Sequence, residues 1–111
     1  MKRRIDDGFT FIAIAYGANA ETMNFEQANY FWVFSLYNGK VRKKELMSIF
    51  PKNSEERIDM LKGSIIDVMI CRNFGPKAMA ELHKRNISLY TFDGGCHAAL
   101  REFMQGKLTE L

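Results

Sequence analysis

Three side chains suited to metal or nucleophilic chemistry stand where apolar segments end and helices are expected to begin. Cys71 closes the apolar run 67–71, and Cys96 and His97 come shortly after the apolar run 87–92. A helix N-terminus offers unpaired N–H groups and a positive dipole end, so it favours anions and lowers the pKa of a thiol. A thiolate with an imidazole nearby is a ligand set suited to iron, copper or metal–sulfur species. The sequence therefore indicates a binding site at these two junctions.

Plainer interpretations of the same side chains stay open. Cys71 is favoured as a small buried hydrophobe, and Cys96 and His97 fit ordinary first-turn residues as well as ligands. Adjacent helical residues point about 100° apart, so Cys96 and His97 are not expected to form a thiolate–imidazole pair. Met23 is expected to pack against its neighbours rather than to reach a soft metal. His83 is expected to face solvent.

The elements that must position these side chains can be predicted from apolar patterning and end signals. Asn38-Gly39 is a strong hairpin signal between two strands, and Asn53 with Glu56 three residues later is typical of a helix start. Pro76 suits the first turn of a second helix. In chain order, the expected segments are strands 9–16, 29–37 and 40–49, helix 53–63, strand 67–71, helix 76–83, strand 87–92, and a helix from Gly95 or Cys96 to Gly106.

This order, β-β-β-α-β-α-β-α, predicts an α/β fold built on a five-stranded mixed sheet. A meander followed by two right-handed crossovers gives the strand order 3-2-1-4-5, with helices on both faces. That arrangement is ribonuclease-H-like. It brings loops 17–27, 72–76 and 93–97 to one edge of the sheet. We expect a mobile leader over residues 1–8 and a single domain over residues 9–111.

Composition narrows the class of protein. A chain of 111 residues that is 47% hydrophobic suits one ordinary soluble domain, and no apolar run approaches the length of a membrane span. Two cysteines do not make a disulfide framework, so reduced thiols and a cytoplasmic location are expected. The net charge of +3 is mild. The basic cluster 40–44 is expected to be an exposed strand protected by lysines rather than a nucleic-acid site.

Two enzyme classes fit poorly. Two-metal nuclease chemistry needs converging carboxylates, yet the strand 9–16 contains none, and Asp67 would lie at the opposite edge. Asp93 is expected to cap the third helix. A thiol-redox enzyme is the least favoured of the functions considered, because the chain has no Cys-x-x-Cys motif.

The second half of the chain resembles the dinitrogenase iron–molybdenum-cofactor biosynthesis family, which includes NifX-type carriers and the carboxy-terminal domain of NifB-type proteins. The resemblance covers residues 11–108 and is strongest in the second half, where it is carried by the segment 67–78, Leu82, and the segments 86–90 and 100–108. In the first half, the segment 24–28 aligns with the family's His-Phe-Gly-basic-Ala loop, and Asn38-Gly39-Lys40 matches a later turn. Phe25, Ala28 and Gly75-Pro76 keep family positions, and Cys71 matches a cysteine of many members.

The resemblance implies a small ribonuclease-H-like domain that binds or passes on an anionic metal–sulfur cofactor, such as iron–molybdenum cofactor or a precursor, without turnover. Relatives include orange-type proteins that hold a molybdenum–copper sulfide cluster. The sequence departs from the family pattern at four places. Asn24 replaces the loop histidine, Glu26 the glycine, Gln27 the basic residue, and Arg72-Asn73 a Gly-Gly pair. An anionic cluster should be repelled by Glu26 and attracted by Arg72.

We therefore expect a non-enzymatic cofactor carrier or accessory protein that works with donor and acceptor proteins of cofactor assembly. Its expected cofactor contacts are Asn24, Arg72, Asn73, Gly75 and Gly95, with Cys96 and His97 as metal ligands. The alternative is an interaction or regulatory module of the same fold that has lost cofactor binding. Nucleic acid and membrane are not expected partners, and both a monomer and a homodimer remain open.

Overall fold

The computed structural model describes residues 8–50, 53–61 and 65–111. The expected leader falls largely on residues 1–7, and the expected helix stop Gly63 falls on 62–64, so both lie outside the described residues. The elements in chain order are β1 (Phe9–Tyr16), the 3₁₀ turn η1 (Ala18–Ala20), β2 (Tyr30–Tyr37), β3 (Lys40–Ser48), α1 (Ser54–Met60), β4 (Val68–Cys71), α2 (Pro76–Lys84), β5 (Ser88–Thr91) and α3 (Cys96–Met104).

The five strands form one mixed sheet in the order β3-β2-β1-β4-β5, which confirms the predicted topology. β2 pairs antiparallel with both β1 and β3, whereas β4 runs parallel to β1 and to β5. The hairpin between β2 and β3 turns at Asn38 and Gly39, which both have positive φ. Asn and Gly adopt that conformation at low cost, so the local sequence fixes this turn.

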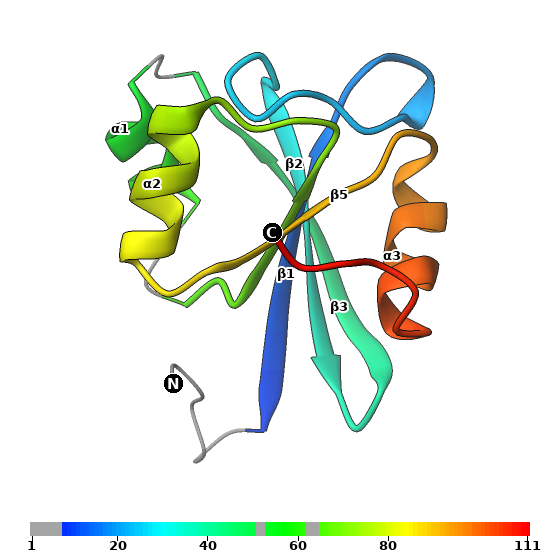
Figure 1. Ribbon diagram of the computed structural model, residues 1–111. Helices are drawn as coiled ribbons and strands as arrows, with labels where there is room; N and C mark the ends of the chain where they lie inside the picture. The colour runs from blue at the N-terminus through cyan, green and yellow to red at the C-terminus, as the bar shows by residue number, and fades with distance from the viewer. Residues whose placement is uncertain (1–7, 51–52, 62–64) are drawn as a thin grey trace.

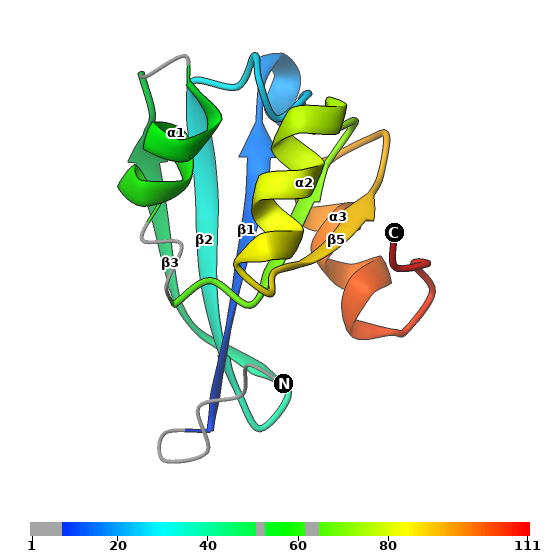
Figure 2. The ribbon, with the colours of Figure 1, turned by 60° about the vertical axis from the view of Figure 1, so that its left-hand side comes forward.

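Helices cover the two faces of the sheet unequally. Figures 1 and 2 show α1 and α2 on one face and α3 alone on the other. Alternate residues of β1 serve the two sides, because successive strand side chains point to opposite faces. Ala13 and Ala15 belong to the core under α1 and α2, while Ile12 and Ile14 belong to the core under α3. Small residues thus face the two-helix layer.

The first helix begins as predicted but buries an unexpected cation. Asn53 accepts a hydrogen bond from the Glu56 amide at 3.1 Å, which confirms it as the N-cap. Ile58 and Leu61 are buried. Beyond the helix, the buried residue is Ile66, and Ile65 is only half-buried. Arg57 lies on the buried side of the helix and is 2% exposed.

The other two helices begin at the predicted junctions. α2 starts with Pro76 after the N-cap Gly75, and α3 starts with Cys96 after the N-cap Gly95. The expectation that Asp93 caps α3 is wrong, because no side chain caps that helix and Asp93 is paired with Arg72 instead. In the described part of the chain, none of the helices has the length and apolar character needed to span a membrane.

Candidate functional site

Three loops meet beyond the carboxyl ends of β1, β4 and β5, as the topology predicts. Backbone hydrogen bonds tie them together: Arg72 N donates to Met23 O at 2.9 Å, and Thr22 N donates to Gly94 O at 2.7 Å. Figure 1 shows the three segments gathered at the upper end of the sheet. We call residues 17–29, 72–75 and 92–95 the three-loop edge. Ligands of open α/β sheets bind at such an edge.

Thr22 holds the centre of the three-loop edge, and no sequence signal marked it. Its side chain is fully buried. The hydroxyl donates to Phe92 O at 2.7 Å and accepts from Gly94 N at 3.3 Å. The Thr22 carbonyl accepts from the guanidinium of Arg72 at 2.8 Å. This single residue therefore links the first loop to both of the others.

Arg72 is the cation of this edge. Besides its bond to Thr22, its Nε lies 3.5 Å from Asp93 Oδ1. The Arg72 side chain remains 40% exposed, and that of Asp93 is 80% exposed. A guanidinium has five N–H donors, so these two contacts leave it capacity for an incoming anion. Arg72 thus has the position and the charge that the sequence analysis expected of it.

Glu26 occupies the N-terminus of α2. Its Oε2 accepts a hydrogen bond from Gly75 N at 2.7 Å. A carboxylate is stabilised at this end of a helix by the dipole and the unpaired amides. A side chain at position 75 would overlap the same carboxylate oxygen, which is why glycine fits there. The Gly75 amide expected to bind a cofactor is therefore already bonded to an anion of the chain itself.

The two asparagines expected at the site both have internal partners. Asn24 Nδ2 donates to Gln27 Oε1 at 2.8 Å, within the first loop. Asn73 Oδ1 accepts from Phe74 N at 2.9 Å, and Asn73 O accepts from Phe25 N at 3.0 Å. Both residues lie on the three-loop edge. Asn73 is exposed and Asn24 half-buried.

Arg57 of α1 binds backbone carbonyls of the first loop, and the sequence analysis did not predict this role. Its guanidinium donates to the carbonyls of Phe25 and Ala28 and lies over the rings of Phe25 and Phe31. Burial lowers the pKa of the Arg57 guanidinium, and the nearby Glu26 carboxylate partly offsets this. Its spacing four residues before Leu61 placed it on the apolar side of α1, and that spacing was the one available signal.

Cys96 and His97 diverge, as expected for neighbours on a helix. Cys96 is 1% exposed, and its thiol donates to Ala15 O at 3.6 Å, beneath α3. Burial raises the pKa of this thiol from its ordinary value of 9.0 to about 11. The expectation that the helix N-terminus lowers this pKa is therefore wrong, because burial away from solvent disfavours the charged thiolate.

His97 is exposed and lies over the β2–β3 side of the sheet rather than over the three-loop edge. Its Nε2 is 3.3 Å from Lys44 Nζ, and its ring packs at 6.3 Å from that of Phe34. Gly95, at the N-cap of α3, pairs with Glu21 in an isolated β-bridge. Among residues 8–50, 53–61 and 65–111, no cluster of three or more His, Cys, Asp or Glu side chains is arranged to hold a metal ion.

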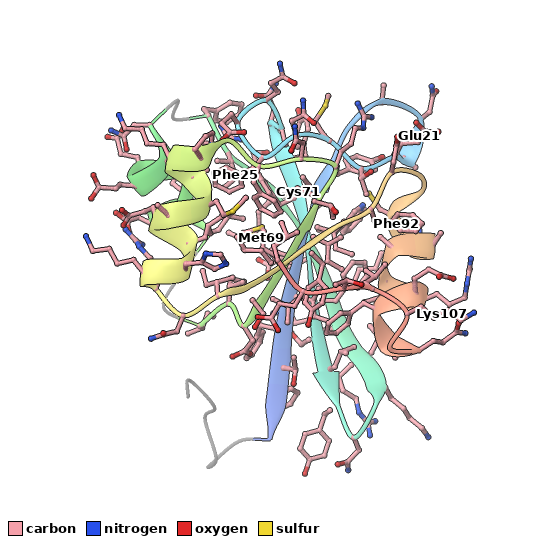
Figure 3. The ribbon with its side chains drawn as sticks, in the orientation of Figure 1. Glu21, Phe25, Met69, Cys71, Phe92 and Lys107 are labelled. Carbon is pink, nitrogen blue, oxygen red and sulfur yellow. The ribbon has the colours of Figure 1, made fainter. Side chains whose placement is uncertain are left out.

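Cys71 and Met23 take the packing roles that the sequence favoured. Cys71 is fully buried, and burial raises the pKa of its thiol well above the ordinary value. Met23 is half-buried and packs against the core under α1 and α2. Figure 3 shows Phe25 on the α2 side and Phe92 on the α3 side, with Cys71 between them. His83 is exposed, as expected.

Two cavities lie at opposite ends of the sheet. A cavity of about 320 Å³ at the three-loop edge is lined by Gly17, Met23, Gln27 and the rings of Tyr16 and Tyr30, among others. The larger cavity, about 810 Å³, lies at the far end near Asp67 and Glu110. The smaller cavity is the one lined by residues of the first loop of the three-loop edge, so size alone does not identify the site.

The chain is thus a small α/β domain in which three loops with polar side chains meet at one edge of the sheet, and comparison with known families identifies it further. The model of the family described as "Dinitrogenase iron-molybdenum cofactor" matches residues 10–106. The chain therefore belongs to the dinitrogenase iron–molybdenum cofactor family. A search of curated proteins found no match.

Solved structures share the fold at low sequence identity. The apo orange protein from Desulfovibrio gigas has a TM-score of 0.75 at 18% identity, with 92% of each chain covered. A candidate NifB protein from Thermotoga has a TM-score of 0.70 at 24% identity, with 92% of this chain and 93% of that chain covered. A candidate dinitrogenase from Methanocaldococcus jannaschii has a TM-score of 0.75 at 16% identity, covering 91% of this chain and 93% of that one. These similarities establish the fold alone.

Proposed function

We propose that this chain is a non-enzymatic carrier or accessory protein for an anionic metal–sulfur cofactor, such as iron–molybdenum cofactor, a precursor or a related cluster. In this role it would take its cargo from a donor protein and release it to an acceptor in the cytoplasm. Membership of the family supports the class of cargo. The observation that carries the proposal is Arg72, an exposed cation held at the junction of three loops.

The cargo would meet Arg72 first, because a guanidinium attracts anions and donates hydrogen bonds to them. Asn24 and Asn73 would add side-chain amides from the two adjoining loops, and Gly95 would add backbone from the third. Gly75 N–H would join only after Glu26 moves away. A bound cargo that must displace an internal carboxylate is held less tightly, which suits a protein that passes it on.

The proposal also includes a more specific component, in which Cys96 or His97 binds the metal of the cargo directly. His97 is exposed, so its imidazole could meet cargo after leaving Lys44. Cys96 would first have to leave its buried position beside Ala15. The two residues are therefore tested separately as well as together.

A second candidate is an interaction module that has lost cofactor binding. The specific observation in its favour is that internal carboxylates already meet both anion-binding groups, Glu26 at Gly75 and Asp93 at Arg72. In that case, the three-loop edge would be a folded remnant held together by its own charges.

The two candidates are separated by anaerobic loading. The purified protein is incubated with a nitrogenase cofactor donor, re-isolated, and analysed for iron, molybdenum, copper and sulfide. The carrier predicts stoichiometric metal that falls by about tenfold in Arg72→Gln. Arg85→Gln is the matched control, because Arg85 is bonded to Asp59 and Glu81 away from the edge.

Metal content in Cys96→Ala, His97→Ala and the double variant then tests ligation. Unchanged metal in all three would remove the two residues from the site while leaving the carrier in place. The absence of metal from the wild-type protein, with the fold retained, would overturn the carrier and favour the interaction module.

A further inference from the structure

The two edges of the sheet differ in whether they are covered. At the β5 edge, the C-terminal segment adds a short pairing: Tyr90 bridges Glu110, and Leu111 N donates to Leu89 O at 2.9 Å. At the other edge, no described residue pairs with β3 on the side away from β2. Figure 2 shows β3 as the outermost strand. An uncovered edge presents N–H and C=O groups that can pair with another strand.

The β3 edge carries a strong local excess of positive charge. Residues 40–46 are all exposed. The strand carries four cations, Lys40, Arg42, Lys43 and Lys44, but only one carboxylate, Glu45. The ion pair between Lys43 and Glu45 spans 3.9 Å with both side chains mostly exposed, so it neutralises little. This charge density is far above that of the chain as a whole, whose net charge is +3.

Aromatic rings of β2 hold two of these cations in place. Lys44 Nζ lies 4.7 Å from the centre of the Trp32 ring, and the Arg42 guanidinium lies 5.8 Å from that of Tyr37. Such contacts fix the direction of a charged side chain without neutralising it. The cations of the β3 edge are therefore partly oriented before any partner arrives, which lowers the ordering cost of binding.

Apolar side chains alternate with the cations on the α3 side of the hairpin. Leu46, opposite Trp32, is 45% exposed, and it stands two residues from Lys44, opposite Phe34. A strand added beside β3 would place alternate side chains on this face. The complementary side chains on this face are an acidic residue beside Lys44 and, two positions along the added strand, an apolar residue beside Leu46.

We propose that the β3 edge accepts an acidic, extended segment of a partner protein as an added sixth strand. A second copy of this chain fits less well, because antiparallel pairing of β3 with itself would set Lys and Arg against Lys and Arg. Nucleic acid would use the charges but not the unpaired backbone groups. Edge lysines repel basic strands and attract acidic ones, so protection and specificity come from the same residues.

The proposal is independent of cofactor binding, because it uses a different surface from the three-loop edge. The probe is a fluorescein-labelled peptide as long as β3 in which pairs of glutamates alternate with pairs of valines, so that each face of the added strand presents acidic and apolar side chains in turn. Binding to the full chain is followed by anisotropy and by the fluorescence of Trp32, the single tryptophan. Lys40→Glu/Lys43→Glu is expected to weaken binding by about tenfold, the order expected for two reversed charge pairs. Lys84→Glu/Lys107→Glu changes the net charge equally at exposed positions off the strand and should leave binding unchanged.

Two N-methylated peptides test strand addition itself without altering the protein. Methyl groups on one alternate set of amides remove the donors that face β3, and methyl groups on the other set remove donors that face solvent. Strand addition predicts that one of these peptides loses binding and that the other retains it. Equal binding of both peptides, or no binding of the parent peptide, would overturn the proposal.

Oligomeric state and nucleic-acid affinity complete the test. A dimer of the wild-type protein in sedimentation that Lys40→Glu/Lys43→Glu converts to monomer would assign the edge to a second copy and overturn the acidic partner. Tighter binding of a single-stranded oligonucleotide than of the peptide, lost in the same variant, would also overturn it. A monomeric protein that prefers the peptide supports the proposal.

Discussion

The Glu26 carboxylate accepts a hydrogen bond from Gly75 N at 2.7 Å, so a residue of the first loop binds the N-terminus of α2. The contact joins two segments 49 positions apart in the chain. It closes one anion-binding position of the three-loop edge with a charge that the chain itself supplies. Competition between an internal carboxylate and an external anion governs the first two predictions, with Glu26 in the first and Asp93 in the second.

Removing the Glu26 carboxylate should raise the affinity for the anionic cargo and lower the stability of the fold. Glu26→Ala exposes the Gly75 amide, so the affinity for an anionic cluster is expected to rise severalfold. The lost hydrogen bond should lower the free energy of unfolding by about 1 kcal/mol. Cluster titration and urea denaturation measure the two effects. Gly75→Ala is the matched control, since its methyl group displaces the carboxylate without removing the charge. Affinity that falls in Glu26→Ala would contradict this account.

Removing the acidic partner of Arg72 should also raise the affinity for the anionic cargo. Asp93→Asn removes the acidic partner 3.5 Å away but keeps the guanidinium bonded to Thr22. Cargo affinity is expected to increase by about three- to tenfold, because one competing charge is gone. The free energy of unfolding should change by less than about 0.5 kcal/mol, since the pair is exposed. A loss of affinity would show that Asp93 holds Arg72 in its binding position.

Arg57 should prove essential to the order of the first loop. Arg57→Met keeps the length of the side chain and its packing on the rings but leaves the carbonyls of Phe25 and Ala28 without their donor. The free energy of unfolding should fall by about 2 kcal/mol or more. Amide exchange should accelerate over residues 22–29. Arg85→Met, at a more exposed ion pair, should cost less than about 1 kcal/mol. Equal effects of the two substitutions would refute the role of Arg57.

The Cys96 thiol predicts how stability depends on alkaline pH. Its pKa in the folded state, about 11, lies above the ordinary value of 9.0 that applies to the unfolded chain. The folded state therefore favours the protonated thiol, and this contribution is fully present below pH 9 and is lost as the pH rises to 11. Urea unfolding at pH 7.5, 9 and 10.5 should show stability falling across this window. In Cys96→Ala the decline should be shallower, and the difference isolates this thiol from Cys71 and Tyr90, whose pKa values burial also raises.

Much of the architecture was readable from the chain because its signals are local. Asn38-Gly39 fixed the hairpin, Asn53 the start of α1, and Pro76 the start of α2, each through the dihedral angles or hydrogen bonds of neighbouring residues. The continuous apolar runs of β4 and β5 implied buried parallel strands. Together with the handedness of crossovers, these signals determined the strand order and the edge at which three loops meet.

Only the tertiary structure decided which hydrogen bonds and ion pairs connect the three loops at that edge. Glu26 meets Gly75, Arg72 meets Asp93, and Thr22 joins all three loops through contacts between residues far apart in the sequence. The pKa of the Cys96 thiol also depends on tertiary structure, because burial beneath α3 raises it. Propensities and caps act over a few residues, whereas burial and charge pairing depend on which distant segments the fold brings together. The sequence by itself therefore determined which edge of the sheet carries the candidate site, and packing determined which groups at that edge already have partners within the chain.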